Sequence, residues 1–305
     1  MPDMKHAVVA AILVAGLMAS PRAQGYLPYR VFDTTAGQFT DFEAMAADLV
    51  KADIVFVGEQ HDDPNTHRLE RLVLEALAAR KARVILSLEM FERDAQKPLD
   101  EFQAGYLSEA GFLRVSRPWP RYATDYKPLV DFAVERQWPV LAANVPRPIA
   151  SEIAKAGISV LDAKSGSEKA WFAADRQCPV DDEYYARFKE AMGAHPTMDA
   201  LQRFYDAQCV KDETMAESIA RAWTAATSAM SPLAPGAPKP VVVHYNGAFH
   251  SDFGLGTASR TQRRLPSAKV VVITMMPLAD LKALDAVKPE GEDLKRARYL
   301  IYTTK

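Results

Sequence analysis

Cysteine is scarce in this chain, since its 305 residues include only Cys178 and Cys209. The sequence has no Cys-x-x-Cys pair, which excludes a redox motif of the thioredoxin type. We expect the two cysteines to form a disulfide, which would close a loop of about 30 residues and stabilise the fold by about 3 kcal/mol. The alternative is two free thiols, one of them catalytic.

Long apolar runs are also absent. The N-terminal run Ala7–Ala19 covers 13 residues, which is too short to cross a bilayer. A lysine and a histidine precede this run, and small residues follow it up to Ala23. This order predicts a secretory signal peptide over residues 1–23, with cleavage after Ala23. Because no cysteine lies near the cleavage point, we expect no lipid anchor there, and therefore a soluble exported protein that is periplasmic in a Gram-negative source.

An excess of charge of one sign is absent too, since 37 basic residues stand against 39 acidic ones, with a net charge of -2 and a pI near 6.3. This balance excludes a broad basic surface, so we expect no nucleic-acid partner. The basic run Arg260–Arg264 is interpreted as a solvated helix face. The sequence also lacks a P-loop, a Gly-x-Ser-x-Gly elbow and a dinucleotide fingerprint. These absences disfavour an NTPase, a serine hydrolase of that type and an NAD enzyme.

Apolar runs typical of buried strands alternate along the chain with helical patterns, which predicts an α/β fold with a mostly parallel β-sheet flanked by helices on both faces. The predicted strands are 53–57, 84–88, 139–143, 241–245 and 269–274, with an edge strand at Tyr299–Tyr302. The predicted helices are 40–51, opened by a capping box at Thr40, 66–79 and 129–137.

Between residues 165 and 230 the alternation stops and only helical periodicity remains, so we predict a small all-helical subdomain inserted before the penultimate strands. Eight aromatic residues lie in this insert between Trp171 and Trp223. They provide either a small core or a slot for a flat apolar ligand. The predicted parts are therefore the signal peptide at 1–23, an α/β domain at 26–164 and 231–305, and the helical subdomain at 165–230.

One short pattern occurs twice, each time at the end of a predicted strand: Gly58-x-x-His61 and Gly247-x-x-His250. Carboxyl ends of parallel strands share one edge of the sheet, where ligands and catalytic groups collect. We expect Glu59, His61, Glu89 and His250 to meet there, with Asn144, Asn246 and His67 nearby. Two imidazoles and two carboxylates of this kind could ligate a divalent metal ion or act as general acid and base.

Several motifs resemble the haem-binding uptake proteins of the ChaN type, over about residues 32–274. The motifs are Val57–Pro64, Leu88–Arg93, Ala143–Arg147, Ala207–Ala216 and Asn246–Gly254. The resemblance implies a parallel sheet with flanking helices, a small helical domain and a role in handling haem during iron acquisition. The wider superfamily includes Tiki-type metalloproteases and erythromycin esterases, whose paired Gly-x-x-His motifs form an active centre. By that matching, Glu59, His61, Glu89 and His250 are the corresponding positions.

Two functions remain open. The first is haem binding through a tyrosine ligand in the helical region, since tyrosinate ligates haem iron. Tyr185 and Tyr205 are the favoured ligands and Tyr184 the third, with His195, Lys189 and Arg187 near enough in sequence to meet the propionates. We expect a homodimer to close over the haem, and an outer-membrane receptor or transport system as a partner. The second is a metal-dependent hydrolase, an esterase or peptidase, that uses Glu59, His61, Glu89 and His250.

Overall fold

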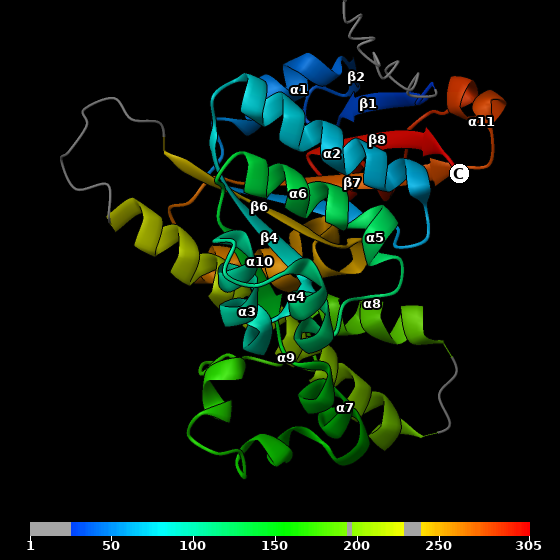
Figure 1. The fold of residues 1–305 in the computed structure, drawn as a ribbon. Coiled ribbons are helices and arrows are strands. Elements are labelled where there is room, and N and C mark those ends of the chain that lie inside the picture. The colour runs from blue at the N-terminus through cyan, green and yellow to red at the C-terminus, as the bar shows by residue number, and fades with distance from the viewer. Residues whose placement is uncertain (1–25, 194–196, 229–238) are drawn as a thin grey trace, which may run out of the picture.

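The computed structural model describes residues 26–193, 197–228 and 239–305, and these form an eight-stranded sheet with helices on both sides (Figure 1). The predicted signal peptide lies outside the described residues. The order of the strands is β2-β1-β8-β7-β3-β6-β4-β5. Their bounds are β1 Tyr29–Asp33, β2 Gln38–Thr40, β3 Ile54–Glu59, β4 Arg83–Glu92, β5 Val140–Asn144, β6 Pro240–Gly247, β7 Val270–Leu278 and β8 Tyr299–Thr304.

The sheet is mostly parallel, as the sequence predicts. The strands β3 to β8 pair in parallel, whereas β1 pairs antiparallel with both β2 and β8. The prediction of an edge strand at Tyr299–Tyr302 is wrong, because β8 lies between β1 and β7. The hairpin β1–β2 covers it, and this hairpin escaped prediction because its strands are short and only partly buried.

The central strands are buried on both faces, which explains their continuous apolar sequences. Every residue of β3 and of β6 is buried. Helices α1, α2, α3, α4 and α6 cover one face, and α9, α10 and α11 cover the other. The helices are α1 Phe42–Leu49, α2 Pro64–Ala79, α3 Gln96–Gln103, α4 Glu109–Ser116, α5 Tyr122–Asp125, α6 Lys127–Glu135, α7 Arg147–Ala156, α8 Glu183–Met192, α9 Met198–Ser228, α10 Gly256–Arg264, α11 Leu281–Ala286 and α12 Asp293–Arg296.

Helix α1 begins two residues later than predicted, because Asp41 rather than Thr40 caps it by accepting a hydrogen bond from the Ala44 backbone N–H at 2.6 Å. Helix α2 begins two residues earlier than predicted. Its cap is Asp63, and Pro64 fits the first turn because a proline needs no N–H partner there. The start of each of these two helices is therefore set by an aspartate, whose short side chain accepts hydrogen bonds from the free backbone N–H groups of the first turn.

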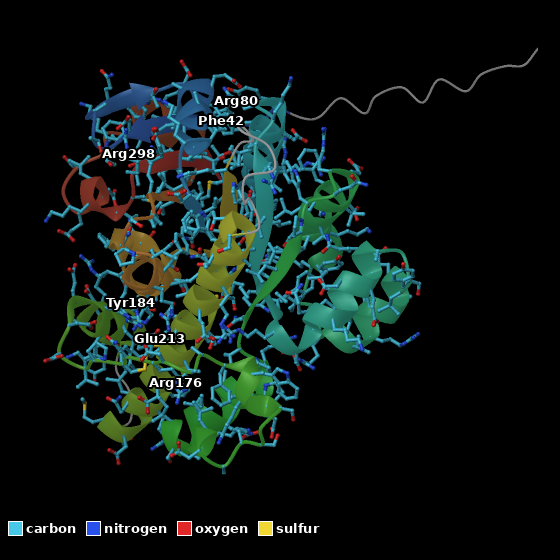
Figure 2. The ribbon with its side chains drawn as sticks, turned by 90° about the vertical axis from the view of Figure 1, so that its left-hand side faces the viewer. Phe42, Arg80, Arg176, Tyr184, Glu213 and Arg298 are labelled. Carbon is cyan, nitrogen blue, oxygen red and sulfur yellow. A yellow bond between two sulfur atoms is a disulfide. The ribbon has the colours of Figure 1, made fainter. Side chains whose placement is uncertain are left out.

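Helix α9 connects the helical region to the sheet. Its first turns, with Leu201 and Tyr205, pack against α8, whereas Ile219 and Trp223 pack against the sheet. A disulfide joins Cys178 to Cys209 of α9, as predicted. Figure 2 shows Tyr184 and Glu213 in this lower part of the molecule, away from Phe42 and Arg80. No helix in the described ranges is long and apolar enough to span a membrane.

Candidate functional site

The ends of β3 and β6 lie side by side, which brings the two Gly-x-x-His motifs together. Glu59 is opposite Gly247 in the parallel register. Glu89 is next to them, and its carboxylate accepts a hydrogen bond from the Gly247 backbone N–H at 2.8 Å. The prediction that Glu89 ends its strand is wrong, because β4 continues to Glu92 past a register irregularity. The four predicted residues nevertheless gather at one edge of the sheet.

The two motif glycines each make room for the other motif. A Cβ on Gly58 would lie 3.0 Å from the Cα of Ala248, in the second motif. A Cβ on Gly247 would lie 2.8 Å from Nε2 of His61, in the first motif. The second separation is shorter than real Cβ contacts allow and the first is tighter than most of them. The repeated glycine therefore lets His61 and the 3₁₀ turn Ala248–His250 lie against neighbouring strand ends.

His250 lies between two buried carboxylates. Its Nε2 is 3.2 Å from Oε1 of Glu89, and its Nδ1 is 2.7 Å from Oδ1 of Asp212. Burial disfavours the charged ring, but Glu89 and Asp212 outweigh burial and raise the pKa of His250 to about 10. The charged ring in turn offsets the burial of Glu89 and holds the pKa of that carboxyl well below its usual range. The arrangement is a carboxylate–imidazolium–carboxylate group.

Asp212 is a site residue that sequence analysis missed. It lies on α9 and also accepts hydrogen bonds from the hydroxyls of Tyr184 at 2.5 Å and Thr257 at 2.8 Å. Burial works against its charge, but His250 outweighs this and lowers the pKa of Asp212. It lies within the motif Ala207–Ala216 of the family resemblance, but an acidic residue in a helical stretch is usually solvated, and nothing in the sequence pairs it with His250.

His61 forms the second pair of the site. Its Nδ1 hydrogen-bonds the buried carboxylate of Glu59, which also accepts a hydrogen bond from the Tyr126 hydroxyl at 2.9 Å. Burial lowers the pKa of His61, but the hydrogen bond to Glu59 and the charge of Glu89 more than offset this, so that the pKa lies above its ordinary value. The side chain is 45% exposed and packs edge-on against Trp119. His61 is therefore the ring through which solvent reaches the site.

A second acidic group lies behind Glu59. His67 does not join His61 and His250 but has its Nδ1 2.9 Å from Oε2 of Glu70 and 3.7 Å from Oε2 of Glu59. Within the described ranges, Glu59, His67 and Glu70 are the group whose possible metal-ligand atoms all lie within 4.8 Å of one another. Burial, and then the charge of Glu59, raise the pKa of Glu70 well above its usual range. The metal role predicted for Glu59, His61, Glu89 and His250 stays a prediction.

The other predicted polar residues support the strand ends. Asn144 donates from its amide to the Glu89 carbonyl at 3.1 Å and accepts from the Val145 backbone N–H. Asn246 donates to the Ser251 hydroxyl at 3.0 Å. Both amides therefore hold loops that follow strands, rather than facing His61 and His250.

The three candidate tyrosines are buried together. The Tyr184 hydroxyl donates to Asp212, and the Tyr205 hydroxyl donates to the Pro179 carbonyl at 2.6 Å. Burial raises the pKa of both hydroxyls above the usual range. In the part of the chain that the structure describes, no hydrogen bond engages the Tyr185 hydroxyl, and its ring contacts Tyr205 and the Nζ of Lys189. His195 lies outside the described residues.

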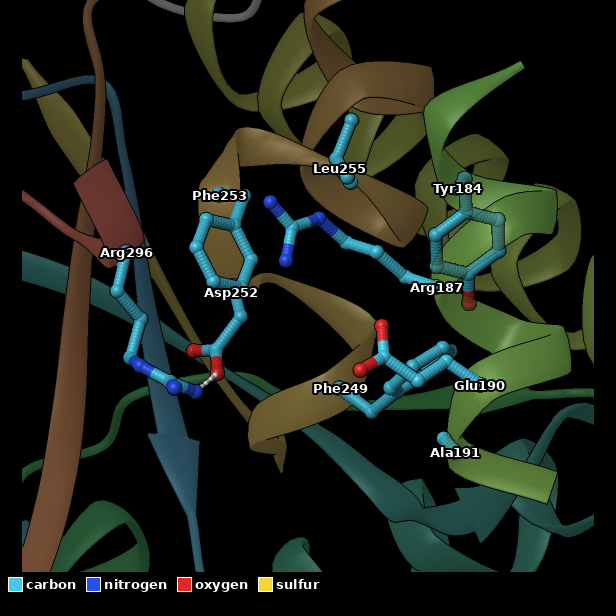
Figure 3. Close-up of a pocket in the computed structure, with 9 residues that line it drawn as sticks. All are labelled: Tyr184, Arg187, Glu190, Ala191, Phe249, Asp252, Phe253, Leu255 and Arg296. Atoms are coloured by element: carbon cyan, nitrogen blue, oxygen red, sulfur yellow. Dashed lines mark hydrogen bonds and ion pairs between the residues drawn. The ribbon is translucent and has the colours of Figure 1, made fainter. Parts of the chain in front are cut away.

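A pocket of about 280 Å³ opens next to Tyr184, as Figure 3 shows. Its apolar wall consists of Phe249, Phe253 and Leu255. The predicted propionate partner Arg187 lies over the Phe253 ring at 3.5 Å and pairs with glutamates on either side. Arg296 pairs with Asp252 at 2.5 Å. Both guanidinium groups thus already have carboxylate partners.

A larger groove of about 410 Å³ lies between α7, α8 and α9. Apolar side chains line most of it, and Phe204 and Met192 at its rim are 40% and 36% exposed. Arg147 and Lys211 add positive charge to its wall. The groove borders the strand-end site through Gln208, whose amide nitrogen is 3.3 Å from Nδ1 of His250.

Comparisons with known proteins found several similar solved structures. A ChaN structure from Campylobacter jejuni, described as binding haem cofacially, is 17% identical with a TM-score of 0.65, over 91% of this chain and 97% of that one. A protein from Bacillus cereus is 14% identical with a TM-score of 0.46, over 85% of this chain and 90% of that one. The erythromycin esterase EreC is 13% identical with a TM-score of 0.44, over 91% and 83%. No curated protein matches the chain.

The family comparison covers strands β3 to β6 and helices α2 to α9, with parts of α1 and α10. The matching family model is described as haem-binding uptake, Tiki superfamily, ChaN, and it spans residues 45–261. Both Gly-x-x-His motifs, Glu89 and Asp212 lie within that match. The chain therefore belongs to the ChaN family of haem-binding uptake proteins, within the Tiki superfamily.

Proposed function

We propose that this protein binds haem in the groove between α7, α8 and α9 and acts in haem uptake. The observation that supports this most directly is an exposed apolar groove with cationic side chains in a member of a haem-binding family. Apolar surface of this kind is uncommon on a protein without a ligand or partner for it. The prediction of a flat apolar ligand in the helical region is consistent with the position of the groove.

The chemistry of the groove fits a porphyrin. Phe188, Met192 and Phe204 offer soft and aromatic surface to a planar macrocycle, and Lys211 offers positive charge to a propionate. Arg147 lies in the same wall, but its guanidinium already pairs with Glu92 at 2.6 Å. Lys211 is therefore the proposed propionate partner in this groove, in place of the predicted Lys189 and Arg187. The bound haem would be cargo, and the groove would provide a surface of complementary shape and charge.

The proposed iron ligand is Tyr185. It shares one face of α8 with Phe188 and Met192, at helical spacings of three and four residues. The hydroxyls of Tyr184 and Tyr205 already donate to Asp212 and to a backbone carbonyl, so using either as a ligand would break a buried hydrogen bond. Within the described ranges, no such bond engages the Tyr185 hydroxyl.

Hemin titration followed by visible spectroscopy tests the proposal. We expect a Soret shift with the wild-type protein. Phe204→Asp should weaken hemin binding at least about tenfold, since it places a charge on the apolar wall. Leu281→Asp, an exposed apolar residue on α11, is the matched control and should bind like wild type.

The ligand assignment is tested with the same titration. Tyr185→Phe should alter the bound spectrum, whereas Tyr106→Phe, at a highly exposed tyrosine, should not. Absence of a Soret shift in the wild-type protein would contradict haem binding. A shift unchanged in Phe204→Asp would contradict the groove, and a spectrum unchanged in Tyr185→Phe would contradict the ligand.

The proposal also includes the setting in which the protein acts. One face of a haem in an open groove stays apolar, so a second copy of the chain is the proposed cover, and an outer-membrane receptor or transport system is the proposed partner. The predicted signal peptide supports export to the periplasm. The Cys178–Cys209 disulfide supports an oxidising compartment.

Hydrolysis at the strand-end site is the less supported function. Both ring nitrogens of His250 already face carboxylates, and the charged ring has no lone pair for a metal ion or a proton. Nδ1 of His61 is likewise engaged by Glu59. The metal-dependent esterase or peptidase remains the alternative prediction.

A further inference from the structure

We infer that Glu59, His67 and Glu70 form a buried binding site for one divalent transition-metal ion. The site differs from the predicted strand-end set, with which it shares only Glu59. One imidazole nitrogen and two carboxylate oxygens lie within 4.8 Å of one another. Such a mixed nitrogen and oxygen donor set suits Zn²⁺ and Mn²⁺.

Two oxygen atoms in the site lack hydrogen-bond partners. Oε2 of Glu59 and Oε1 of Glu70 are fully buried, and within the described ranges no donor reaches either of them. The residues are only 2% and 0% exposed, so bulk solvent does not reach these oxygens. Buried carboxyl oxygens without partners are costly, and either a proton shared by the two carboxyl groups or a cation between them removes that cost.

Neighbouring residues fix the orientation of His67 and Glu59, as the residues around a metal site usually do for its ligands. Metal-bound histidines generally have a carboxylate or carbonyl at the other ring nitrogen. Nε2 of His67 is 3.4 Å from Oδ2 of Asp125 and 3.3 Å from the His61 carbonyl. Asp125 is itself held by Arg121 at 2.9 Å, and Glu59 by the Tyr126 hydroxyl. An outer layer of contacts therefore fixes both His67 and Glu59.

An entry path exists as well. A surface pocket of about 580 Å³ between α2, α5 and α6 is lined by His67 and Asp125, together with Pro64 and Thr124. The haem groove between α7, α8 and α9 is lined by different residues. A metal ion can thus reach His67 without passing through that groove. The metal-site inference and the haem-site proposal can therefore be tested independently.

Metal titration of the hemin-free protein tests the inference. Full-length protein is stripped with a chelator and titrated calorimetrically with ZnCl₂ and separately with MnCl₂, and bound metal is counted after dialysis. We expect one equivalent per chain of at least one of the two metals, with a rise in unfolding temperature. His67→Gln and Glu70→Gln should lose that equivalent. Asp125→Asn should weaken binding about 10- to 100-fold, as the loss of an outer contact does.

Three controls locate the site within the fold. Glu43→Gln removes a 75% exposed carboxylate on α1, outside the entry pocket, and should bind like wild type. A His61→Ala, His250→Ala double variant should keep its metal, which separates this site from the strand-end set. Circular dichroism of the metal-free variants verifies folding.

Three outcomes would overturn the inference. If the wild-type protein binds neither metal, the proposed site holds only a proton shared by Glu59 and Glu70. Retention of metal by folded His67→Gln and Glu70→Gln would move the site elsewhere. Loss of metal only in the histidine double variant would assign it to the strand ends. Hemin binding, measured in parallel, should be unaffected in every variant.

Discussion

His250 is the residue whose charge the site depends on most. It is buried between Glu89 and Asp212, and each carboxylate would be an unpaired buried charge without it. Removing one member of a buried ion pair commonly costs about 3–5 kcal/mol, because the remaining charge has no partner. His250 therefore stabilises the fold at the strand ends as well as setting the charge of the site.

The stability of the protein should depend on pH through this ring. The pKa of His250 is raised from 6.5 to about 10 in the folded chain, so its stabilising contribution is complete below pH 6.5 and is lost as pH rises toward 10. We expect the free energy of unfolding, measured with urea, to fall over this range in the wild-type protein. His250→Gln should fall less steeply, since other titrating groups are common to both proteins. Equal slopes would contradict the assigned charge.

At this scale the sequence predicts part of the site. The Gly-x-x-His repeat identifies Glu59, His61 and His250 because each follows an unmistakable buried strand. Asp212 and the position of His67 behind Glu59 could not be predicted, since both are set by how helices dock onto the sheet. Tertiary contacts of this kind have no local sequence signal.

At the scale of elements, the two motif glycines permit the ends of β3 and β6 to lie side by side. Gly58→Ala would push a Cβ against the backbone of Ala248, which cannot move like a side chain. We expect a loss of about 1–3 kcal/mol in unfolding free energy, as in other overpacked sites. Gly166→Ala is the control, because a Cβ there meets no atom within 4 Å. Equal stability of the two variants would refute this reason for the motif.

Gly247→Ala should act on the other motif without comparable loss of stability. The Cβ would meet the end of the exposed His61 side chain, which can rotate away. His61 would then leave Glu59, and its pKa should fall toward the ordinary value because the carboxylate that raises it is lost. NMR titration of the His61 ring measures this shift. An unchanged pKa would mean that the ring stays in place.

Elements differ in how well the sequence predicts them. The strands from β3 to β7 are buried on both faces, so their unbroken apolar runs identified them. The hairpin β1–β2 and the place of β8 beside it were missed or misassigned, because an edge hairpin with half-buried strands has no such run. Helix ends shifted by two residues where a neighbouring aspartate provided the cap.

At the scale of the whole molecule, α9 makes the helical region and the sheet interdependent. It packs against α7, α8 and α10 and also against β5 and β6. The Cys178–Cys209 disulfide ties the segment before α8 to the same helix. The helical region and the sheet share α9. Unfolding of either one therefore removes packing from the other.

The disulfide should therefore stabilise the entire fold and not the helical region alone. A Cys178→Ser, Cys209→Ser variant should lose about 3–4 kcal/mol of unfolding free energy, as expected for opening a loop of this size in the unfolded chain. Far-ultraviolet circular dichroism and tryptophan fluorescence should report one coincident transition in both proteins. An early, partial transition seen by either probe would show that the helical region unfolds independently of the sheet. That result would contradict the role assigned to α9 and favour the separate subdomain that the sequence predicts.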